Sequence, residues 1–457
     1  MTEEPARARP AGRFGLFDGA DGMKLRDHLC IGMSLAPTWL ANEGWRQPDS
    51  GIEGLFSVDF ALDIARRAEA AHLDFVFRPD ASSLPVPVLD TSFGFASLDP
   101  TLLVAALVRE TRRIGLVTTI STMFSPPYTI ARQLMSLHWM SRGRAGWNVV
   151  TALQGHENFG LDEMPSSAER YARAEEAVAA VRALWQSFPA EALLIDRDSG
   201  HFADTGRIHP ADHHGAHFDI AGPLNIPAYP GPHIPLMQAG ASAGGVALAG
   251  KVAEMVFGQT LDLPSALRTR AALSAAAQAA GRDPRDLRLL PGLSLYLADT
   301  REEAMALFLA NHVRIDRDTR LARVRAATGL DLSDWPATRR VLPQDLPEME
   351  APPANPAHAQ VVRDLITRVS PTVEALLASP QVLASVHWQI IGTVEDAFAT
   401  IVDWFEAGAI DGFIAVPGGS WSSLRLTLEE LIPRLAEAGH FRTDYAGDTL
   451  ADHLNGP

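Results

Sequence analysis

Short apolar runs alternate with amphipathic segments along most of the chain. The runs are too short for typical helices and rich in Val, Ile, Leu and Phe, as expected of strands buried on both faces. Between them, apolar residues recur every three or four positions, which predicts helices that cover a sheet. The clearest helix begins at a capping box formed by Ser166 and Glu169 and continues to Phe188. Eight buried strands are predicted, at 29–37, 73–80, 113–122, 145–150, 234–240, 254–258, 287–298 and 411–416.

This alternation predicts an α/β fold, and eight strands predict closure into a (β/α)8 TIM barrel. We expect one barrel domain over residues 1–457, with a mobile leader at 1–24. An insertion at about 300–388 separates the seventh and eighth strands, and its pattern is helical at first and then Pro-rich. Because it is too long for a connection and follows a strand end, we expect a partly mobile lid. A local hairpin is predicted at 217–227.

Composition narrows the range of partners. The net charge of −16 argues against nucleic acid, because phosphate contacts need clustered Lys and Arg. The single cysteine, Cys30, excludes a disulfide within the chain and fits a cytoplasmic location. Since no apolar run reaches about 18 residues, we expect no membrane span. Four clustered histidines lack the spacing of a zinc site, so no metal is expected; they are His209, His213, His214 and His217.

Polar residues at the ends of predicted strands are the candidates for chemistry, since TIM-barrel active sites lie there. Asn148 lies in a buried strand, and its amide offers a donor and an acceptor to a heterocycle such as a flavin ring. It could equally be a buried amide bonded to neighbouring backbone. Ser242 lies among small residues just before a predicted helix, which favours an anion site. A tight turn with a serine N-cap explains that stretch about as well, and its spacing fits neither a dinucleotide fingerprint nor a P-loop.

Several stretches follow the pattern of a known family. They include "GRAGWNVVT" at 143–151, "NFG" at 158–160, "RYARAEE" at 170–176, "WFEAGAIDGF" at 404–413 and "HFRTDY" at 440–445. The chain resembles the nitrilotriacetate monooxygenase, pristinamycin synthase and dibenzothiophene-sulfone monooxygenase group. These proteins belong to the bacterial-luciferase-like flavin monooxygenases. The resemblance runs from about Leu29 to Tyr445 and implies a luciferase-like barrel.

The resemblance also implies an activity, namely a monooxygenase dependent on reduced FMN (FMNH2) and O2 that acts on a small organic substrate. In such two-component systems a separate NAD(P)H:flavin reductase supplies reduced FMN, which reacts with O2 to give a C4a-(hydro)peroxide. A homo-oligomer, either a dimer or a tetramer, is implied as well. The residues carried over are Asp80 near the ring, Thr119 and Asn148 at the isoalloxazine or ribityl chain, and Tyr171, Ser242 and the Ala243 N–H at the phosphate.

The chain departs from that pattern near its N-terminus. Many relatives have a histidine in a Pro-Thr-Gly-His-His type run, where this chain has Pro37-Thr38-Trp39-Leu40. His156 is then the candidate acid/base, and an exposed loop histidine is an equal alternative. Two other functions stay open, a deazaflavin-dependent oxidoreductase and a flavin-binding protein without turnover. Candidate walls of a substrate pocket are Trp39, Phe93, Phe95, Phe124 and Trp421.

Overall fold

Eight parallel strands form a closed barrel in the computed structural model, which describes residues 25–240, 242–348, 353, 356–383 and 387–456. Pairing of β10 with β11 joins the two ends of the sheet and closes the ring. The predicted TIM barrel is thus confirmed, and each predicted strand is present. The barrel strands are β1 (Cys30–Ser34), β2 (Phe75–Arg78), β3 (Gly115–Ser121), β4 (Ala145–Val150), β9 (Leu236–Ala239), β10 (Met255–Gly258), β11 (Arg288–Leu297) and β13 (Gly412–Pro417).

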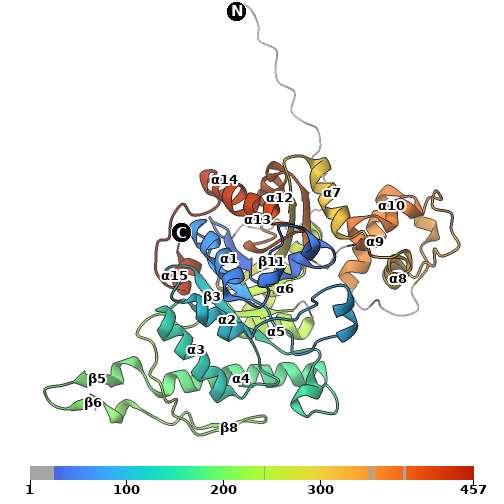
Figure 1. Cartoon of the computed structure of the whole chain (residues 1–457). Helices are drawn as coiled ribbons and strands as arrows, with labels where there is room; N and C mark the ends of the chain where they lie inside the picture. The colour runs from blue at the N-terminus through green and yellow to red at the C-terminus, as the bar shows by residue number, and fades with distance from the viewer. Residues whose placement is uncertain (1–24, 241, 349–352, 354–355, 384–386, 457) are drawn as a thin grey trace, which may run out of the picture.

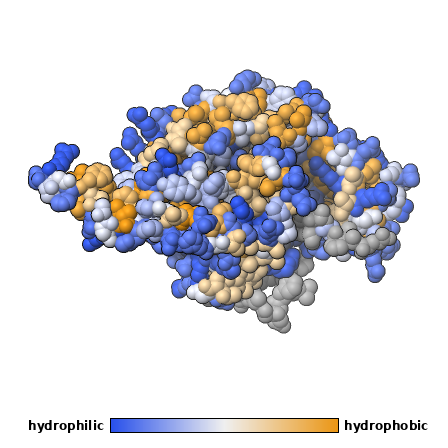
Figure 2. Space-filling model, turned by 90° about the horizontal axis from the view of Figure 1, so that it is seen from below, coloured by the Kyte–Doolittle hydropathy of each residue, from blue (hydrophilic) through white to orange (hydrophobic). Residues whose placement is uncertain are grey.

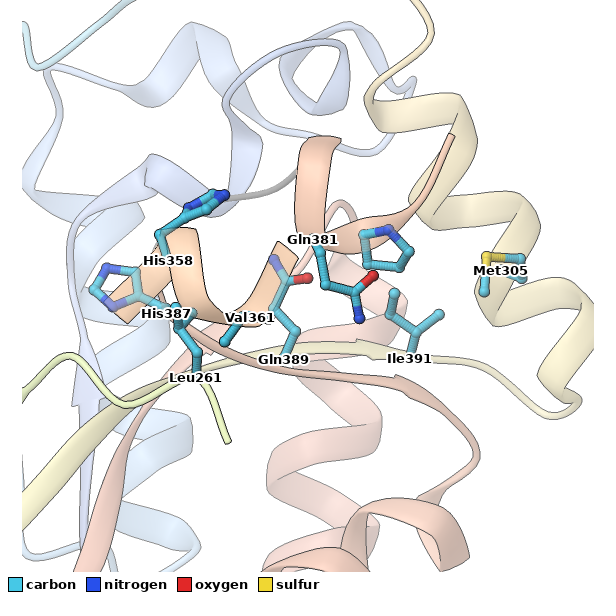
Figure 3. Close-up of a pocket in the computed structure, with 9 residues that line it drawn as sticks. Leu261, Met305, His358, Val361, Gln381, His387, Gln389 and Ile391 are labelled. Atoms are coloured by element: carbon cyan, nitrogen blue, oxygen red, sulfur yellow. The ribbon is translucent and has the colours of Figure 1, made fainter. Parts of the chain in front are cut away.

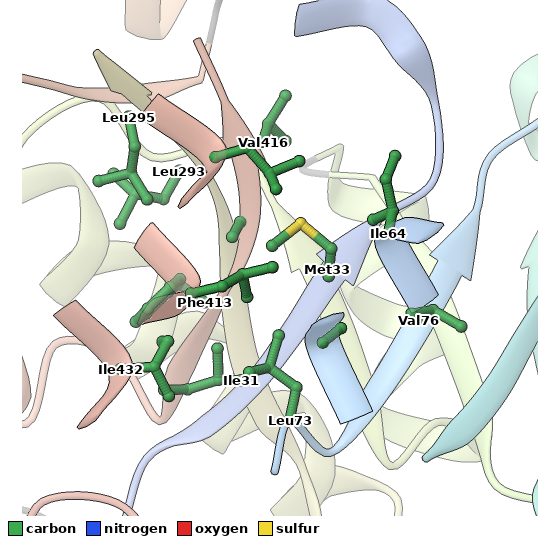
Figure 4. Close-up of a cluster of buried hydrophobic side chains, with 14 of the residues drawn as sticks. Ile31, Met33, Ile64, Leu73, Val76, Leu293, Leu295, Phe413, Val416 and Ile432 are labelled. Carbon is green, nitrogen blue, oxygen red and sulfur yellow. The ribbon is translucent and has the colours of Figure 1, made fainter. Parts of the chain in front are cut away.

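Helices surround the barrel (Figure 1), and the largest cluster of buried apolar side chains lies where strands and helices meet (Figure 4). On α4, the Ser166 hydroxyl accepts the N–H of Glu169, and Ala174, Val178 and Val181 form its buried face. The helices outside the insertion are α1 (Val58–Ala70), α2 (Pro100–Leu107), α3 (Pro127–Ser141), α4 (Ser167–Ser187), α5 (Ala243–Val252), α6 (Leu263–Ala279), α12 (Val394–Glu406), α13 (Trp421–Leu426), α14 (Ile432–Glu437) and α15 (Leu450–Asn455).

The C-terminal helix closes one end of the barrel. Leu450 and Leu454 on α15 join the apolar cluster that fills the barrel interior, together with Phe75, Val117 and Ile414. These contacts lie near the N-terminal ends of the strands, since a side chain at Gly115 or Gly146 would collide with Leu450. A ligand must therefore approach from the opposite end, where the strands terminate.

The segment between β11 and β13 folds largely on itself. Its own apolar core includes Val324, Val362, Ile366 and Leu376. After this part, and before α12, the chain forms β12 (Trp388–Gly392), a ninth parallel strand that pairs with the second half of β11. The sequence did not predict β12, because its apolar residues are few and interrupted by glutamine and glycine. The helices of the insertion are α7 (Arg301–Asn311), α8 (Arg317–Thr328), α9 (Pro356–Val369), α10 (Val373–Leu377) and α11 (Pro380–Leu383).

Two small antiparallel hairpins follow α4. The first, β5 (Leu193–Asp196) with β6 (His201–Ala203), projects from the body (Figure 1) and carries exposed hydrophobic side chains on its surface (Figure 2). The second pairs β7 (His213–His214) with β8 (Asp219–Ile220). The hairpin predicted at 217–227 thus contains only the second strand of this pair. The predicted leader at 1–24 lies outside the described residues.

Candidate functional site

Two neighbouring strands present a polar pair to the barrel interior. Thr119 and Asn148 are paired in register on β3 and β4, and Asn148 Nδ2 donates to Thr119 Oγ1 at 3.0 Å. The Thr119 hydroxyl in turn donates to the carbonyl of Arg78 at 2.7 Å. Trp147 and Val149 pack outward among residues of the surrounding helices, so Asn148 faces inward by the alternation of a strand. The structure thus brings together two residues that the family pattern assigns to the flavin.

The carbonyl oxygen of Asn148 is the unusual atom of this pair. The side chain is only 2% exposed, and its Oδ1 accepts no hydrogen bond in the structure. A buried acceptor without a donor costs about 1–3 kcal/mol, so such an atom normally binds a protein group, an ordered water or a ligand. The open alternative was an amide bonded to neighbouring backbone. Among the described residues, the Asn148 amide bonds to the Thr119 side chain and to no backbone group, so that alternative does not fit this geometry.

A second group of polar residues lies at the end of β9 and the start of α5. Ser242 is the N-cap of α5, where its hydroxyl accepts the N–H of Gly245 at 3.2 Å. The same hydroxyl forms a hydrogen bond of 2.8 Å with the Tyr171 hydroxyl, which reaches over from α4. Ala243 is the first residue of α5, and the first N–H groups of a helix have no acceptor within it. This arrangement presents two hydroxyls and helix N–H groups together.

Glycines allow this close approach. A side chain at Gly244 would lie 2.4 Å from the Tyr171 ring, and one at Gly245 would lie 3.1 Å from the Tyr171 hydroxyl. Gln238 on β9 also contacts this loop, and its buried Oε1 accepts no hydrogen bond. Sequence reasoning did not single out Gln238, although a polar residue on a buried strand is the signal that identified Asn148.

Asp80 follows β2 and is exposed in the ligand-free chain, although neighbouring groups partly desolvate its carboxyl. Burial raises the pKa of its carboxyl and nearby Asp99 adds to this, whereas the Ala81 backbone and Arg78 oppose it. Arg78 itself points away, because its guanidinium donates to the Leu35 carbonyl at 2.9 Å. No hydrogen bond in the structure joins the Asp80 side chain to the polar pair on β3 and β4.

His156 is separate from these groups. It begins the 3-10 helix η5 (His156–Phe159), and its ring lies 3.2 Å from the carboxylate of Glu157. It lines neither of the cavities described below.

A large cavity opens at the C-terminal ends of the strands and extends beneath the insertion. Its volume is about 780 Å³, and we call it the barrel cavity. The rings of Phe77 and Phe257 lie 5.5 Å apart at its wall, and the His387 ring lies 5.5 Å beyond Phe257. Gly292 on β11 makes this possible, because a side chain there would lie 2.7 Å from His387 and 2.9 Å from Phe257. Further walls come from strand ends and from the insertion, including Ser34, Ser294, Val416, Arg323 and Leu383.

The charged side chains around the barrel cavity already form ion pairs or hydrogen bonds within the protein. Arg314 pairs with Glu43 at 3.2 Å, and Arg323 donates to the carbonyls of Val382 and Leu383. Burial lowers the pKa of His387, so its imidazole is neutral near pH 7. The cavity wall is thus mainly apolar, with its ionic groups held in contacts within the protein.

The aromatic residues expected to form pocket walls lie in different parts of the structure. Phe95 lines the barrel cavity, whereas Phe93 and Trp421 pack against the main apolar core. Phe124 stacks on Phe159 at 4.1 Å instead. The side chain of Trp39 lies outside the described residues.

Two of the clustered histidines lie within hydrogen-bonding distance of nearby carboxylates. His213 lies 3.3 Å from Glu176, and His214 lies within 3.1 Å of both Asp212 and Asp219. Across the residues that the structure describes, no group of three or more His, Cys, Asp or Glu is arranged to hold a metal ion. No helix in that part of the chain is long and apolar enough to cross a membrane.

Comparison with known proteins identifies the family. A family model described as "Luciferase-like monooxygenase" matches residues 38–409. N-acetyl-S-(2-succino)cysteine monooxygenase of Bacillus subtilis (strain 168) is 33% identical over 94% of this chain and 97% of its own length. Nitrilotriacetate monooxygenase component A of Aminobacter aminovorans is 34% identical over 90% of this chain and 92% of its own.

A solved structure extends the likeness to three dimensions. Riboflavin lyase (RcaE), solved with modified FMN and substrate riboflavin, is 28% identical and has a TM-score of 0.76, covering 94% of this chain and 96% of that one. The resemblance inferred from the sequence motifs is therefore confirmed. The chain belongs to the luciferase-like monooxygenases, a family of flavin-dependent oxidoreductases, and is itself a monooxygenase.

Proposed function

We propose that the protein is a two-component monooxygenase that binds reduced FMN, uses O2 and oxygenates a small organic substrate. The pairing of two polar groups carries the proposal. The buried, unpartnered Oδ1 of Asn148 faces the barrel interior, and the hydroxyls of Ser242 and Tyr171 meet at the first turn of α5. An acceptor for a ring and donors for a phosphate are the two requirements of a flavin mononucleotide.

The residues present fit this cofactor. Asn148 and Thr119 would hold the isoalloxazine or the ribityl chain, with Asp80 beside the ring. Ser242, Tyr171 and the Ala243 N–H would hold the phosphate. Because the chain carries a net charge of −16, long-range attraction does not favour an anion, so these local donors must supply the affinity. When bound, reduced flavin supplies the electrons that activate O2.

The barrel cavity would hold the reacting part of the substrate. The aromatic side chains of Phe77 and Phe257 would exclude water from this cavity. Excluding water prevents side reactions before oxygen is transferred to the substrate. His156 remains the acid/base candidate from the sequence. In this role, His156→Gln should lower kcat without weakening flavin binding.

Two partners complete the proposal. A separate NAD(P)H:flavin reductase would supply the reduced FMN, and the chain would assemble as a homodimer or homotetramer. Size-exclusion chromatography with light scattering tests the assembly, with a monomer as the contradicting result.

The decisive experiment compares cofactors on the purified chain. Reduced FMN and a reduced deazaflavin are titrated anaerobically, and O2, NADH, a flavin reductase and a panel of chelates, sulfides, sulfones and alkanes are then added. Binding of reduced FMN followed by O2-dependent product supports the proposal. Binding and turnover with the deazaflavin alone would indicate a hydride transferase. FMN binding without product from any substrate would indicate a carrier or sensor.

A further inference from the structure

A second cavity lies where the insertion meets the barrel, and we call it the insertion cavity. Its volume is about 300 Å³. Its walls come from the loop after β10 and from α7, α9, α11 and β12. Figure 3 shows His358 and His387 at one end and Met305 at the other, with Gln381 and Gln389 between them.

The two cavities share part of their walls. His387 and Gln389 line both the insertion cavity and the barrel cavity. Gln389 pairs in register with Ser294 of β11, which also lines the barrel cavity. His387 and Gln389 therefore form the boundary between the two cavities.

The chemistry of the insertion cavity differs from that of the barrel cavity. None of the described residues that line it is Asp, Glu, Lys or Arg. Burial lowers the pKa of both His358 and His387, so the imidazoles are neutral near pH 7. The remaining polar groups are the two glutamine amides. The apolar lining residues are Leu261, Met305, Val361, Pro380 and Ile391.

We propose that the insertion cavity is a second subsite of the active site and takes an uncharged, largely apolar part of the substrate. The proposal rests on the proposed function, in that the reacting part of the same molecule lies in the barrel cavity. A volume of about 300 Å³ suffices for an alkyl or aryl group, near the lower end of ligand pockets. A charged group would have to leave water without a charged partner, which is costly. Substrates with an uncharged apolar extension should therefore be preferred over those charged at both ends.

The test uses the flavin-free protein and a homologous series of probes, from 1-butanol to 1-decanol, titrated by calorimetry. The wild type should bind the longer alcohols more tightly, by about fourfold per added methylene once the chain reaches the insertion cavity. Met305→Trp should fill that cavity. It should leave the affinity for 1-butanol unchanged and lower the affinity for 1-decanol at least tenfold. Val361→Phe, on the other side of the cavity, should act in the same direction and covers the case in which the tryptophan variant folds poorly.

Leu309→Trp is the matched control. Leu309 lies one turn along α7 from Met305, is 41% exposed against 39% for Met305, and does not line the cavity. It should preserve the length dependence. Three results would each overturn the proposal. Leu309→Trp could lose as much affinity as Met305→Trp, neither Met305→Trp nor Val361→Phe could lose affinity, or the wild type could bind all the alcohols equally well. Because the titrations contain neither flavin nor O2, they stand apart from the flavin titration, which tests the proposed function.

Discussion

The two sides of the barrel mouth present different surfaces to a ligand. On the side of β3, β4 and β9, polar side chains on the strands and the first turn of α5 supply hydrogen-bonding groups, two of which are buried amide oxygens without a donor. On the side of β10, β11 and β13, aromatic rings and the insertion enclose cavities. The charged side chains at the walls of the barrel cavity form ion pairs or hydrogen bonds within the protein. The first side suits a fixed, polar cofactor, and the second suits a variable, more apolar substrate.

The two sides also differ in how they are built. The cofactor side uses strand positions and a helix start, which a barrel holds rigidly. The substrate side depends on an insertion with its own small core. A long segment of this kind can change in sequence without disturbing the barrel. Substrate choice should therefore follow the insertion and flavin binding the strands.

The largest expected contrast concerns motion. In the ligand-free protein, amide hydrogens of the insertion, about 300–388, should exchange on the order of a thousandfold faster than those of the barrel strands. The reason is that opening the insertion exposes only a small apolar core, whereas opening the barrel approaches global unfolding. Hydrogen exchange followed by mass spectrometry measures this directly. Uniformly slow exchange across the insertion would argue against a lid that is mobile without ligand.

A strong effect is expected on the cofactor side from Gly244→Val. The new side chain would collide with the Tyr171 ring and separate its hydroxyl from Ser242. Since hydrogen bonds to a charged group are worth roughly 1.5–3 kcal/mol each, loss of both contacts should weaken reduced FMN more than about a hundredfold. Ala247→Val, at an exposed position of the same helix, should leave the affinity unchanged. Equal behaviour of the two variants would show that Tyr171 does not contribute.

A somewhat smaller effect is expected from Asn148→Leu, which removes the unpartnered oxygen while keeping the number and branching of the side-chain heavy atoms. Reduced FMN should bind roughly 5- to 100-fold more weakly, because a ring donor would be left unpaired. Gln389→Leu is the same kind of change on the substrate side and should alter the affinity for reduced FMN by no more than about twofold, the equivalent of about 0.4 kcal/mol. If Gln389→Leu lowered the affinity for reduced FMN as strongly as Asn148→Leu, the division of the barrel mouth into two sides would be wrong.

The smallest effect concerns Asp80. Its pKa is raised, chiefly by burial, so the folded chain holds the proton more tightly than the unfolded chain. The stability it contributes is present below the unfolded pKa and is lost as pH rises through the folded pKa. Asp80→Asn should therefore raise Tm at pH 7 slightly, on the order of 1 °C for a partly exposed group, and leave Tm unchanged at pH 3. Thermal melts at both pH values decide it, and a lower Tm at pH 7 would mean that the ionised carboxylate is stabilised.

The sequence predicted the barrel because its eight strands are buried on both faces and give continuous apolar runs. It did not predict β12, since the run from Trp388 to Gly392 is short and contains Gln389. Asn148 and Ser242 could be singled out as candidates because polar residues are unusual at the ends of buried strands, and their assignment to the flavin stays a prediction. His387 and Phe257 were not, because their contact crosses 130 residues of chain and is recorded locally only by Gly292, one glycine among many.

The central claim is that FMN lies with its phosphate at Ser242, and one comparison of two ligands tests it. Reduced FMN and reduced riboflavin, which lacks the phosphate, are titrated anaerobically into the wild type and into Ser242→Ala. The account predicts that the variant binds FMN about 10- to 100-fold more weakly, while riboflavin affinity and Tm change little, because a lost N-cap costs only about 1 kcal/mol. Equal affinity of wild type and variant for FMN, or an equal loss for both ligands, would contradict it and show that this loop is only a turn.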